Sequence, residues 1–380
     1  MSKLDPVLYH EQLGGKIEVI SRAKLETRED LCLAYTPGVA EACQAIVADP
    51  SKVYSLTRKH NLIAVVTDGS AVLGLGNIGP EASLPVMEGK AALFKAFADV
   101  DAVPIALKTQ DVKEIVRTVE LIAPMFGGIN LEDIAAPRCF EIEKQLIEKL
   151  NIPVFHDDQH GTAIVVLAAL HNALRVVRKQ LTHVKIVING AGAAGISVAK
   201  LLLEAGAVDV TIVDTLGAIY AKRPKLEGEK KILAEKTNLS RHKGNLADVL
   251  VGADVFIGVS RANIVTAEMV QSMRRDAIVF AMANPIPEIM PDLAKAAGAR
   301  VVATGRSDFP NQVNNVLVFP GVFRGLLDGH IRKVSKAMKL RAAYALADYV
   351  KNPTEDCILP SPLDKQVSNV VADAIRSQVV

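Results

Sequence analysis

Two pairs of acidic side chains follow short apolar segments of this chain, and their positions suit the binding of a hard divalent cation. Asp157 and Asp158 follow the apolar segment 152–155, and Glu132 and Asp133 follow a similar segment upstream. Open α/β folds bind their ligands at the C-terminal ends of parallel strands, and Mg²⁺ and Mn²⁺ prefer oxygen ligands. An isolated Asp-Asp pair can also be a helix N-cap with a solvated neighbour, so the other motifs must decide.

A lysine and a tyrosine in the N-terminal part are candidates for proton transfer. Lys90 is expected in the first turn of a helix that starts near 87, where the helix dipole disfavours a cation. The dipole and partial burial would lower the pKa of Lys90 toward the range of a general base. Tyr35 stands just before the Pro37-Gly38 turn. A surface lysine and a core tyrosine are the ordinary alternatives.

A glycine-rich turn in the middle of the chain predicts a dinucleotide site. A strand expected at 184–189 precedes the GxGxxG pattern, and an apolar helix is expected at 196–203. These glycines permit a tight turn and bring the pyrophosphate close to the helix N-terminus. The residues of the turn are Gly190, Ala191, Gly192, Ala193, Ala194 and Gly195. A βαβ unit that binds no nucleotide is the alternative.

The residue that ends the next expected strand bears on the choice of nucleotide. Asp214 would accept a hydrogen bond from the ribose 2′-hydroxyl and repel a 2′-phosphate, so NAD is favoured over NADP. Thr215, Lys222 and Arg223 stand close by and keep NADP open.

Three asparagines follow or precede apolar segments farther along. Asn284 ends the segment that follows the strand expected at 277–281, and Asn314 and Asn315 lie in a polar loop before 318–321. Their amides suit a substrate carboxylate or the nicotinamide amide. Ordinary Asx-turn chemistry is the alternative.

The elements that must hold these residues indicate an α/β fold with two domains. Strands and helices alternate between 60 and 160, which predicts a small parallel sheet. We expect an N-terminal substrate and metal domain at 1–160 and a Rossmann-type, doubly wound NAD domain at 161–320. The helices of 321–380 are expected to pack back on the first domain.

Composition excludes several other classes of protein. The 44 Lys and Arg residues nearly balance 42 Asp and Glu residues, and Trp is absent, which argues against nucleic-acid and membrane surfaces. Four cysteines have neither CxxC nor zinc spacing, which favours a reducing compartment. No long apolar run or secretory signal is evident, so a soluble cytoplasmic protein is expected.

In their joint order, these motifs resemble those of malic enzymes, specifically the short bacterial and archaeal type, over essentially the whole chain. The resemblance is carried by segments 35–40, 65–77, 88–90, 130–133, 155–162, 190–195, 283–285 and 314–321.

The resemblance implies roles for individual residues. Metal ligands are implied at Glu132, Asp133 and Asp158. Lys90 is implied as the general base, assisted by Asp157, and Tyr35 as the general acid. Lys90, Asn284, Asn314 and Asn315 are implied in substrate binding, and Asn284 also in nicotinamide binding.

The implied reaction converts (S)-malate and NAD⁺ (or NADP⁺) to pyruvate, CO₂ and the reduced nucleotide with Mg²⁺ or Mn²⁺, and oxaloacetate decarboxylation is also implied. A homodimer is expected from the same resemblance. One departure concerns Ala71, where larger eukaryotic-type malic enzymes carry an arginine that grips a substrate carboxylate. Backbone amides of 74–79 are one candidate for that task here.

A non-decarboxylating NAD-dependent dehydrogenase of a hydroxy or amino acid is the alternative function. It would share the nucleotide site and a catalytic lysine. It would not need the acidic trio and would release no CO₂.

Overall fold

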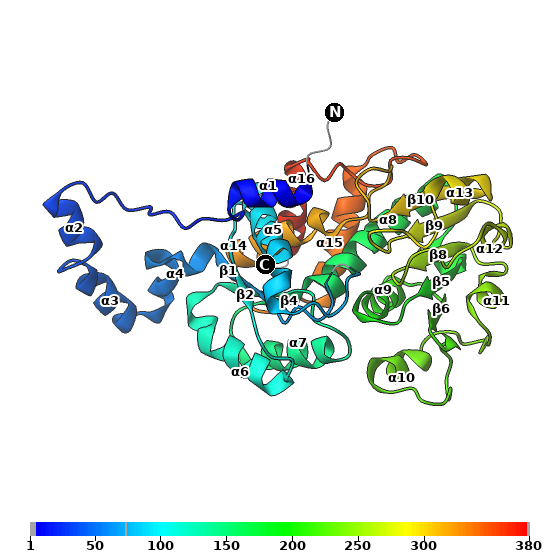
Figure 1. The fold of residues 1–380 in the computed structure, drawn as a ribbon, viewed down its shortest axis with the longest axis horizontal. Coiled ribbons are helices and arrows are strands. Elements are labelled where there is room, and N and C mark those ends of the chain that lie inside the picture. Colours follow the sequence, from blue (N-terminus) through cyan, green and yellow to red (C-terminus); the bar gives the residue numbers. More distant parts are fainter. Residues whose placement is uncertain (1–4, 73, 378–380) are drawn as a thin grey trace.

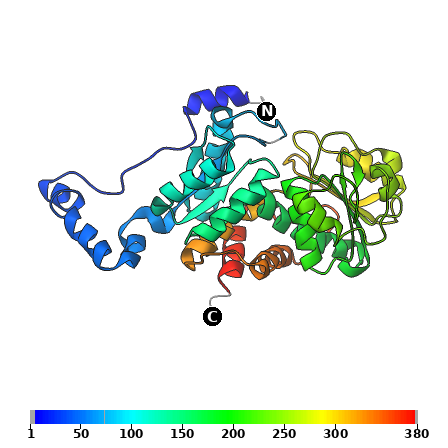
Figure 2. The ribbon, with the colours of Figure 1, turned by 90° about the horizontal axis from the view of Figure 1, so that it is seen from below.

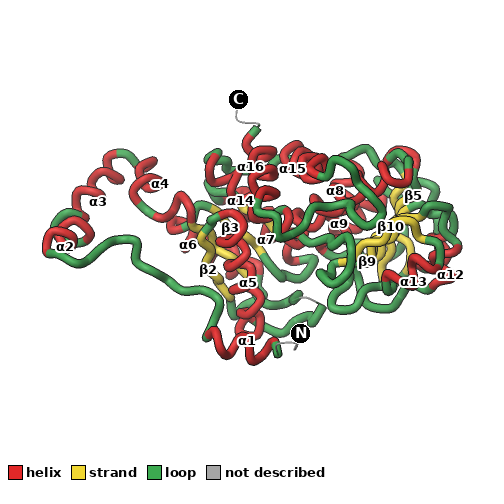
Figure 3. Tube along the Cα trace, turned by 90° about the horizontal axis from the view of Figure 1, so that it is seen from above, coloured by secondary structure: helices red, strands yellow, loops and turns green. Residues whose placement is uncertain are grey.

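The computed structural model describes residues 5–72 and 74–377. Leu73, which is part of the glycine-rich segment, and residues 1–4 lie outside the described residues. Two separate β-sheets organise the rest (Figure 3).

The first sheet is small and parallel, with strand order β2-β1-β3-β4. Its strand β1 is a continuous apolar run that is buried almost throughout, as expected of a parallel sheet covered on both faces. The strands are β1 (Leu62–Thr67), β2 (Asp101–Ala106), β3 (Gly128–Leu131) and β4 (Val154–His156). The helices between them are α5 (Pro80–Ala98), α6 (Val112–Ile122) and α7 (Arg138–Lys149).

The second sheet has the order β10-β9-β8-β5-β6-β7, parallel except for the short β7 at its edge. The order reverses between β5 and β8, which is where doubly wound sheets bind nucleotides. Its strands are β5 (Lys185–Asn189), β6 (Asp209–Asp214), β7 (Gly217–Ala218), β8 (Val255–Gly258), β9 (Ala277–Ala281) and β10 (Ala299–Thr304). Its helices are α9 (Ala193–Glu204), α10 (Gly228–Ala234), α11 (Leu246–Leu250), α12 (Ala267–Gln271) and α13 (Pro291–Ala296). This confirms the Rossmann-type prediction.

A buried helix and three C-terminal helices connect the two parts. The apolar helix α8 (Thr162–Val177) follows the acidic turn and packs on both α9 and α15. The aromatic rings of Phe319 and Phe323 on α14 (Phe319–Asp328) contact Phe94 on α5, with centroids 4.6 and 5.3 Å away. The last helices are α15 (Lys336–Tyr349) and α16 (Gln366–Arg376), and α16 also contacts α5. The C-terminal helices therefore complete the core of the first domain, although boundaries at 160 and 320 stay a prediction.

An N-terminal arm projects away from the rest of the chain (Figures 1 and 2). It holds α2 (Arg28–Ala34), α3 (Val39–Ala48) and α4 (Val53–Leu56), none of which has a buried residue. Before it, α1 (Pro6–Leu13) leads to Lys16, whose backbone nitrogen donates to Glu88 on α5 at 2.9 Å. Thr27 and Asp30 form the capping box that starts α2.

Two helical stretches, Arg28–Ala48 and Asp157–Val177, are long and apolar enough to cross a membrane on length and composition alone. The apolar window of the second is 67% buried inside the fold, as in the core helix of a globular domain. The first is the arm, where the chain turns at the Pro37-Gly38 pair.

Candidate active site

Lys90 lies in the interior of helix α5, so the prediction that it occupies a first helical turn is wrong. The helix begins at Pro80, with Gly79 before it at a φ of +84°, and it continues through Pro85. The Lys90 side chain is 7% exposed, and its Nζ lies 4.0 Å from the centroid of the Phe319 ring. The helix N-terminus therefore contributes little to its electrostatics.

Two carboxylates bind the ammonium group of Lys90. Its Nζ lies 2.6 Å from Asp157 Oδ2 and 2.9 Å from Glu132 Oε1. Burial alone would lower the pKa of Lys90, but these two anions raise it above its ordinary value. The prediction of a lowered pKa for Lys90 is therefore wrong, because the sequence alone did not reveal that two buried carboxylates contact its ammonium group.

Glu132, Asp133 and Asp158 converge as predicted. One carboxylate oxygen from each lies within 4.8 Å of the others. Parallel pairing of β3 with β4 brings the ends of the two strands together, and Asp158 Oδ2 accepts a hydrogen bond from the Asp133 backbone nitrogen at 2.8 Å. Burial, reinforced by repulsion from neighbouring carboxylates, raises the pKa of Glu132 to about 7, of Asp133 to about 9 and of Asp158 to about 6.

These three residues fit a hard divalent cation. Asp133 Oδ2 is buried and has no hydrogen-bond partner among the described residues. Three clustered carboxylates with raised pKa values repel one another until a positive charge is shared among them, and they offer the oxygen ligands that Mg²⁺ and Mn²⁺ prefer. The site is therefore a candidate metal centre beside Lys90.

Asn315 joins this centre, whereas Asn314 does not. The Asn315 amide donates to Asp157 Oδ2, the same oxygen that binds Lys90. The Asn314 side chain instead accepts from the Val316 backbone nitrogen at 2.9 Å, which is a local Asx turn. The predicted substrate contact of Asn314 is therefore not supported by its position here.

Asn284 lies where the two domains approach each other. It is exposed and precedes Pro285 through a cis peptide bond. A Cβ atom built on Gly74 would lie 2.3 Å from its carbonyl oxygen, so the glycine-rich loop of the first domain touches the NAD side here. The predicted contact of Asn284 with substrate or nicotinamide stays a prediction.

The glycine-rich turn lines a cavity of about 500 Å³ at the switch point of the large sheet, between β5 and β8. Gly190, Ala191 and Gly192 form part of its wall, and Ala193, Ala194 and Gly195 begin α9. A Cβ on Gly195 would lie 1.8 Å from the Gly190 carbonyl oxygen, so this close turn requires glycine. The cavity therefore lies where doubly wound sheets bind nucleotides.

Asp214 also lines this cavity, but its carboxylate is paired with positively charged side chains of the same chain. Arg223 donates to both of its oxygens, and Lys230 Nζ lies 3.2 Å from Oδ2. Burial would raise the pKa of Asp214, but hydrogen bonds from Arg223 and Leu216 lower it to about 2. The carboxylate is therefore ionised, and Arg223 and Lys230 occupy the positions beside it.

Both halves of the chain match one enzyme family. Residues 14–147 match the malic enzyme N-terminal domain, and residues 159–380 match the malic enzyme NAD binding domain. The chain belongs to the malic enzyme family. The alternative of a non-decarboxylating dehydrogenase is not supported.

Individual malic enzymes are similar over nearly the whole chain. The bifunctional malic/malolactic enzyme of Bacillus subtilis (strain 168) is 58% identical, over 96% of this chain and 90% of that protein. The NAD-dependent malic enzyme of Geobacillus stearothermophilus is 57% identical, over 96% and 76%. A crystal structure of the NAD-dependent malic enzyme from Thermotoga maritima superposes with a TM-score of 0.95 at 49% identity, covering 98% of this chain and 99% of that one. NADP-dependent malic enzymes are also among the relatives, for example that of Halomonas elongata (strain ATCC 33173 / DSM 2581 / NBRC 15536 / NCIMB 2198 / 1H9) at 45% identity, over 98% of this chain and 92% of that protein.

Tyr35 lies outside the site of its own malic enzyme chain. It follows α2 in the projecting arm, and 67% of its surface is exposed. Neither a hydrogen bond nor an ion pair joins it to Lys90 or the acidic trio among the described residues. Lys90, Asp157, Asn315 and the acidic trio come together without it.

Sequence reasoning missed His156 and Arg138 as parts of this region. His156 is 0% exposed, and its Nδ1 lies 3.7 Å from Asp158 Oδ2. Arg138 Nη2 donates to Asp68, at the end of β1, at 3.1 Å. A buried polar residue that ends an apolar strand is the available signal for His156. Arg138 gives no such signal, because Asp68 lies far from it in sequence.

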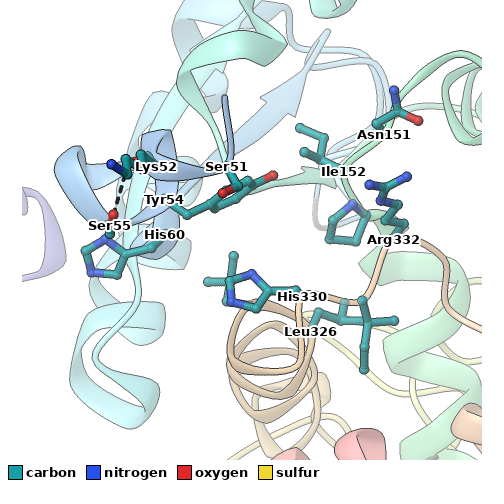
Figure 4. A pocket seen from close by; sticks show the side chains of 14 residues that line it. Ser51, Lys52, Tyr54, Ser55, His60, Asn151, Ile152, Leu326, His330 and Arg332 are labelled. Carbon is teal, nitrogen blue, oxygen red and sulfur yellow. Dashed lines mark hydrogen bonds between the residues drawn. The ribbon is translucent and has the colours of Figure 1, made fainter. Parts of the chain in front are cut away.

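A cavity of about 770 Å³ lies away from Lys90 and the acidic trio of this malic enzyme (Figure 4). His60, Gly127 and Pro153 line it, and each of them precedes a strand of the small sheet. The acidic residues instead follow the C-terminal ends of those strands. The cavity therefore occupies the opposite edge of the sheet and contains none of the predicted site residues.

Proposed function

We propose that this malic enzyme oxidises and decarboxylates (S)-malate to pyruvate and CO₂ with a nicotinamide dinucleotide as hydride acceptor, and that it also decarboxylates oxaloacetate. The observation that carries the proposal is the convergence of Glu132, Asp133 and Asp158 beside the buried Lys90–Asp157 pair. Asp214 favours NAD, and Arg223 beside it allows residual acceptance of NADP.

Lys90 and Asp157 are suited to remove the proton from the C2 hydroxyl. Their polar atoms are 2.6 Å apart, so the Lys90 ammonium can give a proton to Asp157 Oδ2 while its Nζ takes the proton of the C2 hydroxyl. Burial raises the pKa of Asp157 to about 7, which makes its carboxylate a competent proton acceptor near neutrality. A divalent cation held by the acidic trio would stabilise the negative charge that develops on the C2 oxygen. Asn315 fixes Asp157 in place, and Tyr35 supplies the proton to C3 after CO₂ leaves.

The test is NADH absorbance with malate and Mn²⁺, with pyruvate assayed as the product. Asp158→Ala should abolish metal-dependent turnover while NADH binding stays near wild type. Lys90→Ala should block oxidation, and Tyr35→Phe should slow protonation of the enolate more selectively. Normal malate oxidation by Asp158→Ala in excess chelator would reject the metal assignment.

The exposed arm supports a homodimer in which Tyr35 serves the partner's site. Large apolar side chains cover the arm, with Leu33 71% and Val47 84% exposed. Apolar surface of this extent marks a site of protein association. A second copy that covers it can receive Tyr35 beside its own Lys90.

Mixed dimers test this arrangement. Tyr35→Phe and Lys90→Ala chains should each be impaired in one step of the reaction. A heterodimer of the two has one complete site if Tyr35 acts across the interface, and none if it acts within its own chain. Random mixing should then restore about a quarter of wild-type activity, since half of the dimers are mixed and each has one complete site. Failure of a verified heterodimer to regain activity would reject the exchange.

We place the enzyme in the cytoplasm. Its four cysteines are unpaired thiols, and Cys139 is buried. Thiols that persist without pairing are typical of reducing compartments.

A further inference from the structure

We propose that Glu143, His160 and Lys339 are positioning residues for the turn that carries Asp157 and Asp158. This turn, Asp157–Gly161, is a π-helix. π-Helical turns are rare and occur frequently at functional sites. Support from neighbouring elements is needed to hold two functional carboxylates on such a turn in fixed positions.

One oxygen of Glu143 binds both ends of the turn. Glu143 Oε1 accepts from the His156 backbone nitrogen at 3.1 Å, just before the turn, and from His160 Nε2 at 2.8 Å, near its end. Glu143 lies on α7 and is 6% exposed. A buried acceptor shared by both ends fixes the distance between them.

Lys339 fixes the orientation of the histidine. Its Nζ donates to His160 Nδ1 at 2.9 Å. A histidine that accepts at Nδ1 is neutral and has its proton on Nε2, which is the nitrogen that faces Glu143. Hydrogen bonds therefore run in one direction from Lys339 through His160 to Glu143. They connect α15, the turn and α7, three elements that are distant in sequence.

The middle of the turn is held separately. Ser197 on α9 donates its hydroxyl to Gln159 Oε1 at 3.3 Å. Gln159 follows Asp158 directly, so α7, α15 and α9 all contact the segment from which the acidic side chains extend. Residues that hold metal ligands in this way typically change metal affinity by about 10- to 100-fold when they are replaced. The inference rests on the proposed metal site.

The full-length enzyme is tested with Glu143→Met and Glu143→Gln. Glutamine keeps an oxygen at the position of Oε1, whereas methionine fills similar space without an acceptor. Mn²⁺ affinity is measured by electron paramagnetic resonance, NADH affinity by fluorescence, and thermal stability by calorimetry. Glu143→Met should weaken Mn²⁺ binding about 10- to 100-fold, while Glu143→Gln stays close to wild type and both bind NADH normally. Lys339→Met should also weaken Mn²⁺ binding. This variant tests the positioning role if Glu143→Met does not fold.

Glu288→Met is the matched control. Glu288 is also a buried glutamate, and it accepts from the Ser260 and Ala283 backbone nitrogens at 3.0 and 2.9 Å, far in sequence from the turn. Its replacement should lower thermal stability and leave Mn²⁺ affinity unchanged. Wild-type Mn²⁺ affinity in Glu143→Met and Lys339→Met, or equal weakening by glutamine and methionine, would overturn the positioning role. Absence of Mn²⁺ binding by the wild-type enzyme would instead reject the proposed metal site.

Discussion

His156 is a buried histidine that the folded enzyme keeps neutral. Burial lowers its pKa from 6.5 to about 4, and neither ring nitrogen has a hydrogen-bond partner among the described residues. Between pH 6.5 and 4, the unfolded chain binds a proton at this position and the folded chain does not. The resulting contribution to stability is therefore present above pH 6.5 and is lost as the pH falls toward 4, by about 2 kcal/mol between pH 8 and 5.

His156→Asn should remove this part of the pH dependence. We expect urea titrations of the metal-free enzyme at pH 8 and 5 to show a smaller acid loss of unfolding free energy in the variant, by about 2 kcal/mol. Other groups titrate in both proteins, so the difference between the two acid losses of unfolding free energy reports the titration of His156. Equal losses in the enzyme and the variant would mean that the folded enzyme protonates this ring normally.

At the scale of residues, the sequence predicted the acidic trio because each member follows an apolar strand. Parallel pairing then brings such residues to one edge. It could not predict the pKa of Lys90, because that depends on Asp157 and Glu132, which approach only after folding. Asn314 and Asn315 are adjacent in sequence, and only the fold distinguishes the amide that caps a turn from the one that binds Asp157.

At the scale of elements, the π-helical turn depends on a glycine that leaves room for a carboxylate. A Cβ built on Gly161 would lie 1.8 Å from Asp157 Oδ1. Gly161→Ala should therefore displace Asp157 and lower kcat for malate oxidation on the order of 100-fold, the effect of a misplaced reactive group. Steady-state kinetics with malate and Mn²⁺ measure this loss.

Gly89→Ala provides the comparison. Gly89 lies inside α5 beside Lys90, and a Cβ there meets nothing within 4 Å. Alanine favours a helix over glycine, so this variant should gain roughly 0.5–1 kcal/mol of stability. Loss of activity in Gly161→Ala that is no greater than in Gly89→Ala would contradict the steric argument.

The start of helix α5 shows where element prediction failed. Proline usually disrupts a helix interior, so a helix that contains Pro85 is difficult to predict from sequence. The structure instead starts α5 at Pro80 and continues through Pro85. Strands β5 and β9 were predicted well, because their continuous apolar runs are typical of parallel sheets covered on both faces.

At the scale of the whole molecule, the two domains meet where Gly74 approaches Asn284. Gly74 and Gly76 have the same φ of +78°, so alanine is equally strained in both. A Cβ on Gly74 would lie 2.3 Å from the Asn284 oxygen, whereas one on Gly76 meets nothing within 4 Å. Gly74→Ala should hold the domains apart and lower kcat/KM for malate about tenfold more than Gly76→Ala does.

Thermal stability separates this effect from general damage. Both variants should melt at similar temperatures, because both carry the same backbone strain. Equal kcat/KM values would show that the contact between the domains is unimportant for turnover.

The position of Tyr35 is also a property of the whole molecule. Its distance from Lys90 could not be predicted from one sequence, because the arm finds no core within its own chain.

The contact of Phe94 with Phe319 and Phe323 has a consequence for synthesis on the ribosome. The strands of the nucleotide-binding sheet are contiguous between 185 and 304, so that sheet is complete before the last helices are made. The first domain must wait for those helices although it is translated earlier, because domains fold as units only when their whole core has emerged. The malate-binding half of this enzyme is therefore begun first and finished last.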